Sequence, residues 1–493
     1  MSQFTYNQIN NIYYFSSKRW DLNLKDNILL KLEVSTSNPS TLRFFSILML
    51  LSIIIIAPFG NSWKISMVLA QCFLLSSLLS FLETILDERR GGVSFMYEFF
   101  MLFFVALPAI IQISEQTFSW FATFEPLHVC WTFGLLALSQ IVFKLVTIIQ
   151  QRFFRKKKYE VSASYLGDED VIFYTKWTWL LAFVALIFAF FAGPSNLFIA
   201  RFEAYGVGLE GMTQQFIFIS RSISLLVMVM LIFLIKNTRN LRYRRLNTYV
   251  ILIFLIPFFC INYLPALPRF VLFGILISLS ILFIDYFRPR NKLLLSLCSL
   301  AVLFLVFPVM KLLGSHDLHI SDIFNRMDVD LIYAYILRVD FDAFMQIVST
   351  VEYYALDIGP IRYGENFLGV ALFFIPAAIW AGKPIHSGEL VSTALGYNFT
   401  NVSNPLPAEA LIGFGLIGPV IVFSLLAFYI ARIEFIARTH QTIYSKTTSY
   451  FTYAVLAGFI VIIMRGSLNA VAAQFGTVFL AIYAIHFTRK FKI

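Results

Sequence analysis

Long apolar runs separated by short polar stretches recur along almost the whole chain. Runs of about 17 to 22 residues are long enough to cross the roughly 30 Å hydrocarbon core of a bilayer as helices. The pattern therefore predicts an all-α polytopic membrane protein with about twelve transmembrane helices. We expect these helices at 44–60, 65–86, 94–113, 128–148, 175–193, 214–235, 247–264, 269–286, 293–312, 410–431, 449–465 and 470–487.

One long segment, 313–409, interrupts this pattern between the ninth and tenth predicted helices. A connection of this length is usually functional. Residues 320–357 place apolar side chains at helical spacing. The apolar stretch 367–381 is too short for a clean crossing, and Pro376 in its middle is typical of a broken helix. We expect a re-entrant or interfacial element there.

Composition excludes an ordinary soluble protein. Of the 493 residues, 59% are hydrophobic and only 13% are charged, and 55 are Phe. A soluble fold has too little interior for so much apolar surface. Four cysteines, Cys72, Cys130, Cys260 and Cys298, lie in apolar runs without paired spacing, so we expect small core side chains and no disulfide frame.

In a membrane protein, a net charge of +10 first suggests an unequal distribution of cations among the loops, and it gives no reason to expect nucleic acid. Most of the 38 lysines and arginines fall in alternate loops if both termini are cytoplasmic and 367–381 does not cross. No signal peptide is apparent at the start. The predicted organisation is a cytoplasmic segment at 1–43, nine helices in 44–312, a large periplasmic loop at 313–409, three helices in 410–487 and a cytoplasmic tail at 488–493.

The cations outside the cytoplasmic loops are mostly arginines. The planar fork of Arg binds phosphate oxygens in a bidentate manner and keeps its charge when desolvated. Lys144 and Lys176, near cytoplasmic helix ends, are expected to snorkel towards water. Lys64, Arg201, Arg221, Arg269, Lys311, Arg326, Arg338, Arg362, Lys383 and Arg465 are expected outside or near the outer leaflet.

Arg221 and Arg465 stand at membrane depth in their predicted helices, which by default indicates a functional site. The alternative is a structural ion pair with Glu203, Glu210, Asp340 or Asp342. For Arg269, in a proline-rich turn, and Arg326, among aspartates, a structural role is the preferred interpretation. An external arginine cluster beside a re-entrant element suggests an anionic lipid-linked substrate whose pyrophosphate is bound and stabilised as a leaving group.

The sequence offers little for a metal or nucleotide. His316 and His319 have no second ligand pair at a clear spacing, so no metal is expected. No nucleotide-binding glycine loop, nucleophile elbow or zinc-protease motif is present. The predicted chemistry therefore needs no cofactor.

Several stretches resemble Wzy-type O-antigen and enterobacterial common antigen polymerases. The segments Arg338–Asp342, Ile361–Glu365, Ile375–Pro384 and Pro405–Gly418 resemble the long periplasmic loop of that family, Arg465–Asn469 resembles an element of a late helix, and Arg201–Tyr205 resembles an earlier external element. The chain departs from one common family form at Pro376-Ala377, where the family has a proline–arginine pair.

The resemblance implies an integral-membrane glycosyltransferase of the GT-C-like type in the bacterial inner membrane. Such an enzyme moves a growing glycan from undecaprenyl pyrophosphate onto the non-reducing end of a new lipid-linked repeat unit, without a metal. The resemblance also implies a partner that regulates chain length, a polysaccharide co-polymerase.

We assign roles to the candidate residues as hypotheses. The pyrophosphate clamp comprises Arg201, Arg221, Arg338, Arg362, Lys383 and Arg465, and Tyr363 and Trp380 are expected to stack on sugar rings or to anchor at the interface. Glu409 is the first choice for the general base, with His386 and Glu365 as alternatives. A carboxylate at this position would equally well stabilise a helix N-terminus.

Two other functions fit the pattern less well. An O-antigen ligase uses the same donor, but we would expect a His near position 409, where this chain has none. A lipid-linked oligosaccharide flippase or other transporter would be expected to show two similar halves and charges deep in several helices.

Overall fold

Every regular element in the part of the chain described by the computed structural model is helical, apart from one isolated bridge between Leu166 and Thr238. That part comprises residues 38–119, 122–155, 166–199, 211–307, 341–375, 379–438 and 443–491. Within these residues, 11 helices are long and apolar enough to cross a membrane. Helices satisfy their own backbone hydrogen bonds, as a lipid environment requires. The architecture is that of a polytopic membrane protein.

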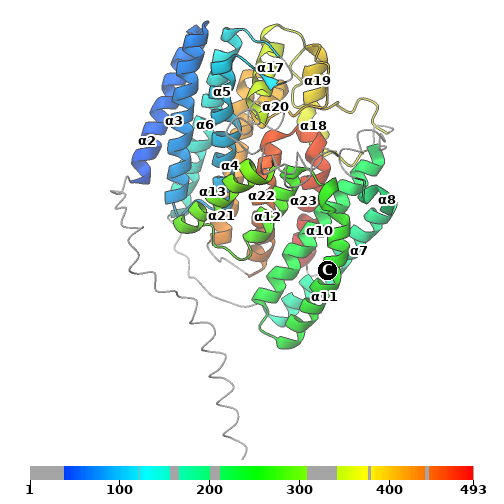
Figure 1. Cartoon of the computed structure of the whole chain (residues 1–493). Helices are drawn as coiled ribbons and strands as arrows, with labels where there is room; N and C mark the ends of the chain where they lie inside the picture. The colour runs from blue at the N-terminus through cyan, green and yellow to red at the C-terminus, as the bar shows by residue number, and fades with distance from the viewer. Residues whose placement is uncertain are drawn as a thin grey trace, which may run out of the picture.

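The first group of helices stands on one side of the molecule (Figure 1). A π-helical segment, η3, joins α4 and α5 into one continuous helix that packs against α3. Its members are α2 (Pro39–Ile56), η2 (Ala57–Phe59), α3 (Trp63–Leu86), α4 (Gly92–Phe100), η3 (Met101–Ala106), α5 (Leu107–Glu115) and α6 (Pro126–Arg155).

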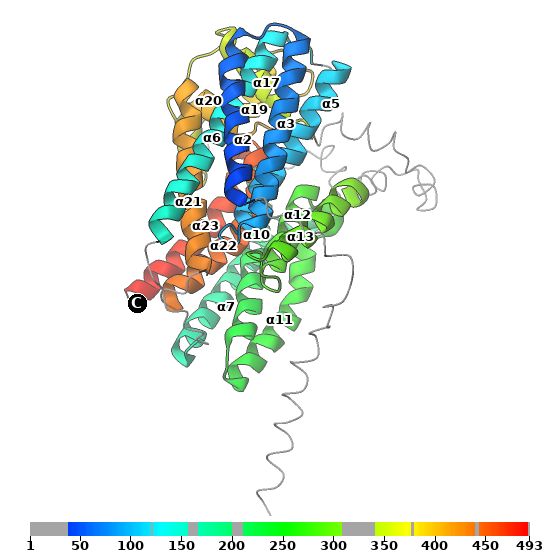
Figure 2. The ribbon, with the colours of Figure 1, turned by 90° about the vertical axis from the view of Figure 1, so that its left-hand side faces the viewer.

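A second group lies on the other side and is offset along the helix direction (Figures 1 and 2). In it α10 packs on both α7 and α11. Its members are α7 (Asp168–Phe191), α8 (Pro194–Leu197), α10 (Gly211–Asn237), α11 (Leu241–Ile261) and η5 (Leu264–Ala266).

The remaining elements fill the space between the groups and one end of the bundle. Helix α22 contacts α4, α10, α12, α21 and α23, so it forms the centre of the molecule. These elements are α12 (Arg269–Ser280), α13 (Pro289–Ala301), η6 (Val302–Val306), α17 (Ala343–Ala355), α18 (Glu365–Ala371), α19 (Ser387–Ala394), α20 (Leu406–Phe414), η8 (Gly415–Ile417), α21 (Gly418–Arg438), α22 (Ile443–Arg465) and α23 (Leu468–Lys490).

The predicted spanning helix at 269–286 is wrong in its length. Helix α12 has 12 residues, which gives about 18 Å and falls short of a bilayer core. The chain then turns, because the Asp285 side chain accepts a hydrogen bond from the Phe287 N–H (3.1 Å) and the Tyr286 hydroxyl bonds Ser280 Oγ (2.6 Å). Apolar residues continue through this turn, so the length of the hydrophobic run exceeds the length of the helix.

Within the predicted re-entrant stretch 367–381, the described helix is α18. It has seven residues and is followed by turns up to Ile375. Its length of about 10 Å is that of a short helix docked on the bundle. It packs on α23, where Gly369 lies so close to Asn469 and Pro384 that a Cβ atom would clash. Whether this element enters a membrane stays a prediction.

A buried charge network ties α2, α3, α4 and α6 together. Glu83 of α3 contacts Arg43, Arg90 and Lys144, and Arg90 also pairs with Glu98 (3.1 Å). Lys144 is almost fully buried, 3.6 Å from Glu83, so the expectation that it snorkels is wrong. Attraction to a buried carboxylate replaces water as its solvation.

The same end of the bundle contains two further buried charges. The Lys292 ammonium donates to the carbonyl oxygens of Thr84, Asp87 and Arg90, at 2.6, 2.8 and 3.1 Å. Glu434 of α21 accepts hydrogen bonds from the backbone and side chain of Ser94, at 2.7 and 2.8 Å. Lys292 therefore satisfies carbonyl oxygens at the C-terminal end of α3, and Glu434 satisfies an N–H group in the N-terminal turn of α4.

Candidate functional site

Arg221 is the most unusual cation in the described residues. It lies inside α10, only 7% exposed, and its Nε donates to the Ile261 carbonyl oxygen (3.2 Å). Among the described residues no carboxylate lies within ion-pairing distance of it. An unpaired buried charge costs several kcal/mol, so it is normally retained for a purpose.

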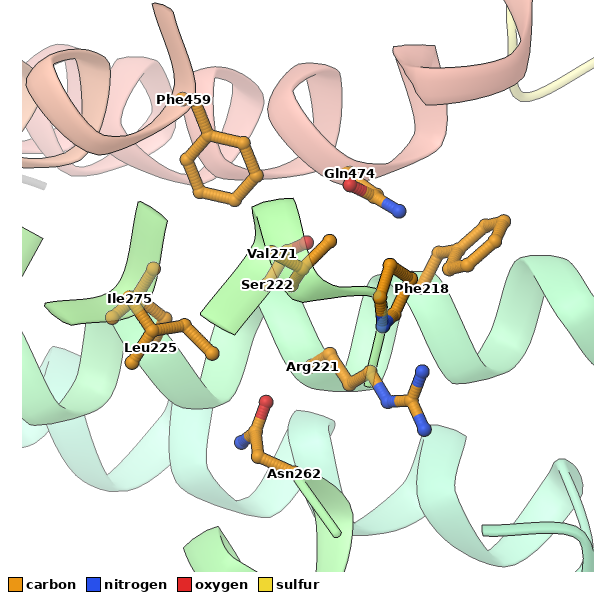
Figure 3. Close-up of a pocket in the computed structure, with 10 residues that line it drawn as sticks. Phe218, Arg221, Ser222, Leu225, Asn262, Val271, Ile275, Phe459 and Gln474 are labelled. Atoms are coloured by element: carbon orange, nitrogen blue, oxygen red, sulfur yellow. The ribbon is translucent and has the colours of Figure 1, made fainter. Parts of the chain in front are cut away.

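Arg221 borders a small cavity between four helices and the end of α11 (Figure 3). About 10 Å³ of it is accessible to water, which is room for roughly one molecule. The amides of Asn262 and Gln474 also line it, and the described structure gives neither Asn262 Oδ1 nor Gln474 Oε1 a donor. The cavity therefore combines a cation with unsatisfied polar groups in an apolar surrounding.

Arg465, the last residue of α22, reaches the other side of the first turn of α12. Its guanidinium donates to Asp342 Oδ1 (3.0 Å) and lies over the Phe270 ring, 4.4 Å from the ring centroid. The ring stabilises the cation from one face. This ion pair with Asp342 is one of the structural alternatives that the sequence left open, and it fixes the start of α17 against α22.

Arg269 is the first residue of α12. It donates to the Phe307 carbonyl oxygen (3.3 Å), and its guanidinium lies 5.9 Å from the centroid of that ring. Sequence reasoning favoured a structural role for Arg269. Its contacts with Phe307 are compatible with that role, which stays a prediction. The residue shares its helix turn with Pro268 and Val271 of the Arg221 pocket and with Phe270, the stacking partner of Arg465. We call Arg221, Arg269 and Arg465 the arginine cluster.

The electrostatics of this region are positive. Arg269 begins α12, Arg465 stacks on Phe270 of its first turn, and the pocket beside Arg221 is lined by Pro268 and Val271 from the same turn. The N–H groups at this helix end add a partial positive charge. Asp342 pairs with Arg465 and offsets part of this charge. Such an arrangement can bind a phosphate-like anion.

Aromatic rings form the wall behind the arginine cluster. Phe104 packs on both Phe270 and Phe341, at 5.5 and 5.3 Å between ring centroids, and Phe270 packs on Phe307 at 5.5 Å. Phe307 and Phe341, the described residues on either side of 308–340, both belong to this wall. Arg338 belongs to that segment and Arg201 to 200–210, so both predicted clamp residues lie outside the described residues.

Glu409 occupies a buried position beside the α22–α23 turn. It is 1% exposed, and its Oε1 accepts hydrogen bonds from the Leu468 N–H (2.9 Å) and from the hydroxyls of Ser387 and Ser467. Its Oε2 accepts one from Asn366 Nδ2 (2.7 Å). The carboxylate therefore joins α18, α19 and α20 to the first turn of α23, with donors on both oxygens.

The turn between α22 and α23 links Glu409 to the arginine cluster. Arg465 binds Asp342, whereas Ser467 and Leu468 bind Glu409 two and three residues later. These hydrogen bonds from Arg465, Ser467 and Leu468 hold the segment 341–409 against the bundle. The position of the arginine depends on this anchoring.

The other predicted site residues lie nearer the surface. Arg362 is half-buried, and its backbone N–H donates to the Ile412 carbonyl oxygen (2.9 Å). Tyr363 is 86% exposed and adopts a left-handed φ of 46°. Trp380 is half-buried, and its carbonyl oxygen accepts the Lys383 N–H (2.9 Å).

Lys383 is engaged by the protein itself. Its ammonium donates to the carbonyl oxygens of Phe373 and Ile375, at 3.0 and 2.7 Å, and so closes the turns after α18. Desolvation lowers the pKa of this ammonium from its ordinary value. Lys383 therefore holds the turns after α18 in place. A phosphate would have to compete with these two carbonyl oxygens for its ammonium.

We call Glu409 and its donors Asn366, Ser387, Ser467 and Leu468 the Glu409 hub. His386 is an exposed titratable residue next to this hub. It is the N-cap of α19, immediately before Ser387, which bonds Glu409. Desolvation by the surrounding protein lowers the pKa of this imidazole, Glu389 opposes the shift, and Lys383 adds to it. The neutral, proton-accepting form is therefore favoured at neutral pH.

Sequence reasoning missed the polar partners that build this site. Asn262 and Gln474 were unremarkable amides in apolar runs, and Asn366, Ser387 and Ser467 had no distinguishing pattern. Only the burial of a polar residue singles them out. A signal was present for Arg269, because two prolines within a short interhelical turn force the chain to begin a new helix at that residue.

No family model, curated protein or solved structure matches this chain. Among the described residues no group of three His, Cys, Asp or Glu side chains is placed to hold a metal ion.

Proposed function

We propose that this protein is a membrane glycosyltransferase that polymerises lipid-linked oligosaccharide repeat units. The donor is a glycan on undecaprenyl pyrophosphate, and the acceptor is the non-reducing end of a second lipid-linked repeat unit. The acceptor hydroxyl oxygen attacks the anomeric carbon, the bond from that carbon to the pyrophosphate oxygen breaks, and a base takes the hydroxyl proton. In this proposal the fold is of the GT-C-like type and the segment 313–409 faces the periplasm of the inner membrane.

The observation that carries the proposal is the arginine cluster at the first turn of α12. Arg221 is buried with no carboxylate partner among the described residues. Arg269 begins α12, and Arg465, from the end of α22, stacks on Phe270 of the same α12 turn. A pyrophosphate leaving group gains negative charge as its bond to the sugar breaks, so fixed guanidiniums stabilise the transition state more than the ground state. They supply this charge without a metal.

The geometry favours His386 over Glu409 as the general base. Both oxygens of Glu409 already accept hydrogen bonds, and the side chain is buried. The exposed imidazole of His386 has its pKa lowered and is one residue from the hub. In this scheme Glu409 is a positioning residue, which holds α19 and the α22–α23 turn in place.

The test of the proposed function is a reconstituted polymerisation assay. The purified full chain in nanodiscs is given undecaprenyl-pyrophosphate-linked repeat units, and the products are separated by size. We expect a ladder of glycan lengths from the wild-type chain. Arg221→Ala should lower turnover about 10²–10³-fold, and Arg221→Lys should not restore it fully.

The matched control is Arg245→Ala, which removes an exposed arginine from α11. It should leave the ladder unchanged. A wild-type ladder from Arg221→Ala would remove the arginine cluster from the reaction. The absence of any ladder from a folded wild-type chain would contradict polymerisation, and addition of lipid A–core as acceptor would then detect a ligase.

A lipid-linked oligosaccharide transporter is the second candidate function. The buried charge network of Glu83, Arg90, Glu98 and Lys144 favours it, because charges in the interior of a helix bundle are typical of transport pathways. A fluorescent lipid-linked oligosaccharide in proteoliposomes distinguishes the two. Protein-dependent movement across the bilayer without elongation would favour the transporter.

A further inference from the structure

A large cavity opens at the end of the bundle opposite α17 and α19. Its volume is about 760 Å³, and the turn 281–288 forms one wall. The ends of α10 and α21 and the first turns of α22 form the others. The volume lies in the range of sites for small ligands, roughly 300–1,000 Å³. The arginine cluster and the Glu409 hub contribute no residue to this cavity.

The charged groups that line the cavity give it a net positive charge. Four cations, Lys236, Arg288, Arg290 and Arg438, face two carboxylates, Glu88 and Asp285. Two of the cations are already engaged within the protein. Arg288 pairs with Asp285 (3.2 Å), and Lys236 donates to the Leu282 carbonyl oxygen and lies over the Phe283 ring.

The other two cations have no protein partner in the described part of the chain. Arg290 and Arg438 are both exposed, and neither has an ion-pair or hydrogen-bond partner among the described residues. They come from different helices, α13 and α21, and line one cavity. Two guanidiniums in the wall of one cavity can bind an anion with several oxygens.

The surface next to the cavity is apolar. On α13, Arg290, Leu294 and Leu297 are spaced four and three residues apart, so they share one helix face. Leu294 and Leu297 are 51% and 59% exposed, and Phe283 on the cavity wall is also exposed. Helix α13 runs obliquely to α2 and α3 in both views (Figures 1 and 2). A cationic site next to an apolar stripe is complementary to an anionic phospholipid, whose phosphate is charged and whose acyl chains are apolar.

Two tyrosines mark the boundary between these environments. Tyr450 and Tyr453 of α22 line the cavity, and their hydroxyls bond the Ile281 carbonyl oxygen (3.1 Å) and the Gly92 N–H (2.8 Å). Tyrosine is enriched where a bilayer core meets its headgroups. Basic pockets between membrane helices bind anionic lipid headgroups.

From this arrangement we propose that the cavity binds the headgroup of an anionic phospholipid, with its phosphate on Arg290 and Arg438 and its acyl chains along α13. The site is independent of the proposed polymerase reaction. Because Tyr450 and Tyr453 belong to the helix that ends in Arg465, a bound lipid would brace α22 from the end opposite the arginine cluster.

The experiment titrates lipid into the purified full chain in nanodiscs made of phosphatidylcholine. Bound lipid is counted by native mass spectrometry, with cardiolipin and phosphatidylglycerol as anionic probes, phosphatidylethanolamine for comparison and inorganic phosphate in parallel. We expect the anionic lipids to bind at least tenfold more tightly than phosphatidylethanolamine. The double variant Arg290→Ala/Arg438→Ala should lose this preference by tenfold or more.

The matched control is Arg244→Ala/Arg245→Ala, which removes two exposed arginines of α11 that do not line the cavity. It should bind the anionic lipids like the wild-type chain. Equal losses in the two double variants would overturn the proposal, because the attraction would then come from overall surface charge.

Two further outcomes test the lipid itself. Leu297→Asn should weaken cardiolipin binding several-fold, since it places a polar group in the acyl stripe, while leaving the fold intact at an exposed position. Inorganic phosphate that protects the chain against heat as well as cardiolipin does, with no effect of Leu297→Asn, would identify a free-anion site and overturn the lipid assignment.

Discussion

At the scale of single residues, burial separates the carboxylates and cations into different tasks. Glu409 and Arg221 are both buried in helices, but the protein surrounds Glu409 with donors, whereas the described residues offer Arg221 one carbonyl oxygen. A saturated ion stabilises the fold locally, whereas an unsatisfied ion is available to a ligand. The two side chains should therefore respond differently to substitution.

Replacement of Glu409 tests its positioning role. Glu409→Gln should lower the free energy of unfolding by about 1–3 kcal/mol, because an amide has one acceptor oxygen and turns its NH₂ group towards buried donors. The measurement is the thermal unfolding midpoint in detergent. Glu389→Gln, an exposed carboxylate of α19, is the control and should change it little.

The pH dependence of turnover tests His386. The pKa of this imidazole is lowered from 6.5, so the neutral form that accepts a proton is present above pH 6.5 and is lost as the pH falls through the lowered value. Turnover should therefore be flat from pH 6.5 upwards and decline below it. His386→Gln should remove the decline and reduce the rate about 10²–10⁴-fold. An unchanged profile would exclude His386 as the base.

At the scale of helices, α12 and α22 meet without side chains between them. A Cβ atom on Gly458 would lie 2.1 Å from the Gly274 carbonyl oxygen, and one on Gly274 would lie 2.8 Å from the Gly458 carbonyl oxygen. Small residues let membrane helices approach closely. This contact sets the height of α12 against α22, and with it the placement of Phe270 beneath Arg465.

A methyl group at this contact should move the two helices apart. Gly458→Ala is expected to destabilise the fold by about 1–3 kcal/mol through overpacking, and to reduce turnover because Phe270 and Arg465 separate. Unfolding midpoint and polymerisation are measured together. Gly211→Ala is the control, because no atom lies within 4 Å of the added Cβ there. Equal effects of both changes would mean that the close approach has no special role.

At the scale of the whole molecule, the two ends of the bundle are built by different interactions. One end contains the network around Glu83, Arg90 and Lys292, and the other contains the Glu409 hub and the arginine cluster. Helix α22 runs between them and contacts both groups of helices. Ionic contacts therefore fasten both ends of an otherwise apolar bundle, for which hydrophobic burial alone gives little preference of partner in lipid.

Removal of Lys292 tests the first of these ends. Lys292→Met should lower stability by about 2–3 kcal/mol, because three buried carbonyl oxygens lose their charged donor. Unfolding by heat or denaturant in detergent measures the loss, and folded yield should fall with it. Lys64→Met, at an exposed position, should be neutral. A stability equal to wild type would show that water replaces the ammonium.

The sequence by itself determined the class of fold and most of the helices. Eleven of the twelve predicted spans correspond to long described helices, since an apolar run of spanning length has no other stable form in a bilayer. It also singled out Arg221 and Arg465, because a cation in such a run is conspicuous. It failed at 269–286, where apolar residues continue through a turn.

The tertiary structure decided which of these residues meet. Arg269 joins Arg221 and Arg465 only because α12 docks on α22 through Gly274 and Gly458. Glu409 finds its donors on three other helices, far away in the chain, and Lys144 finds Glu83 in place of water. Periodicity reports which face of a helix is apolar, but the partner of a buried charge depends on helix packing.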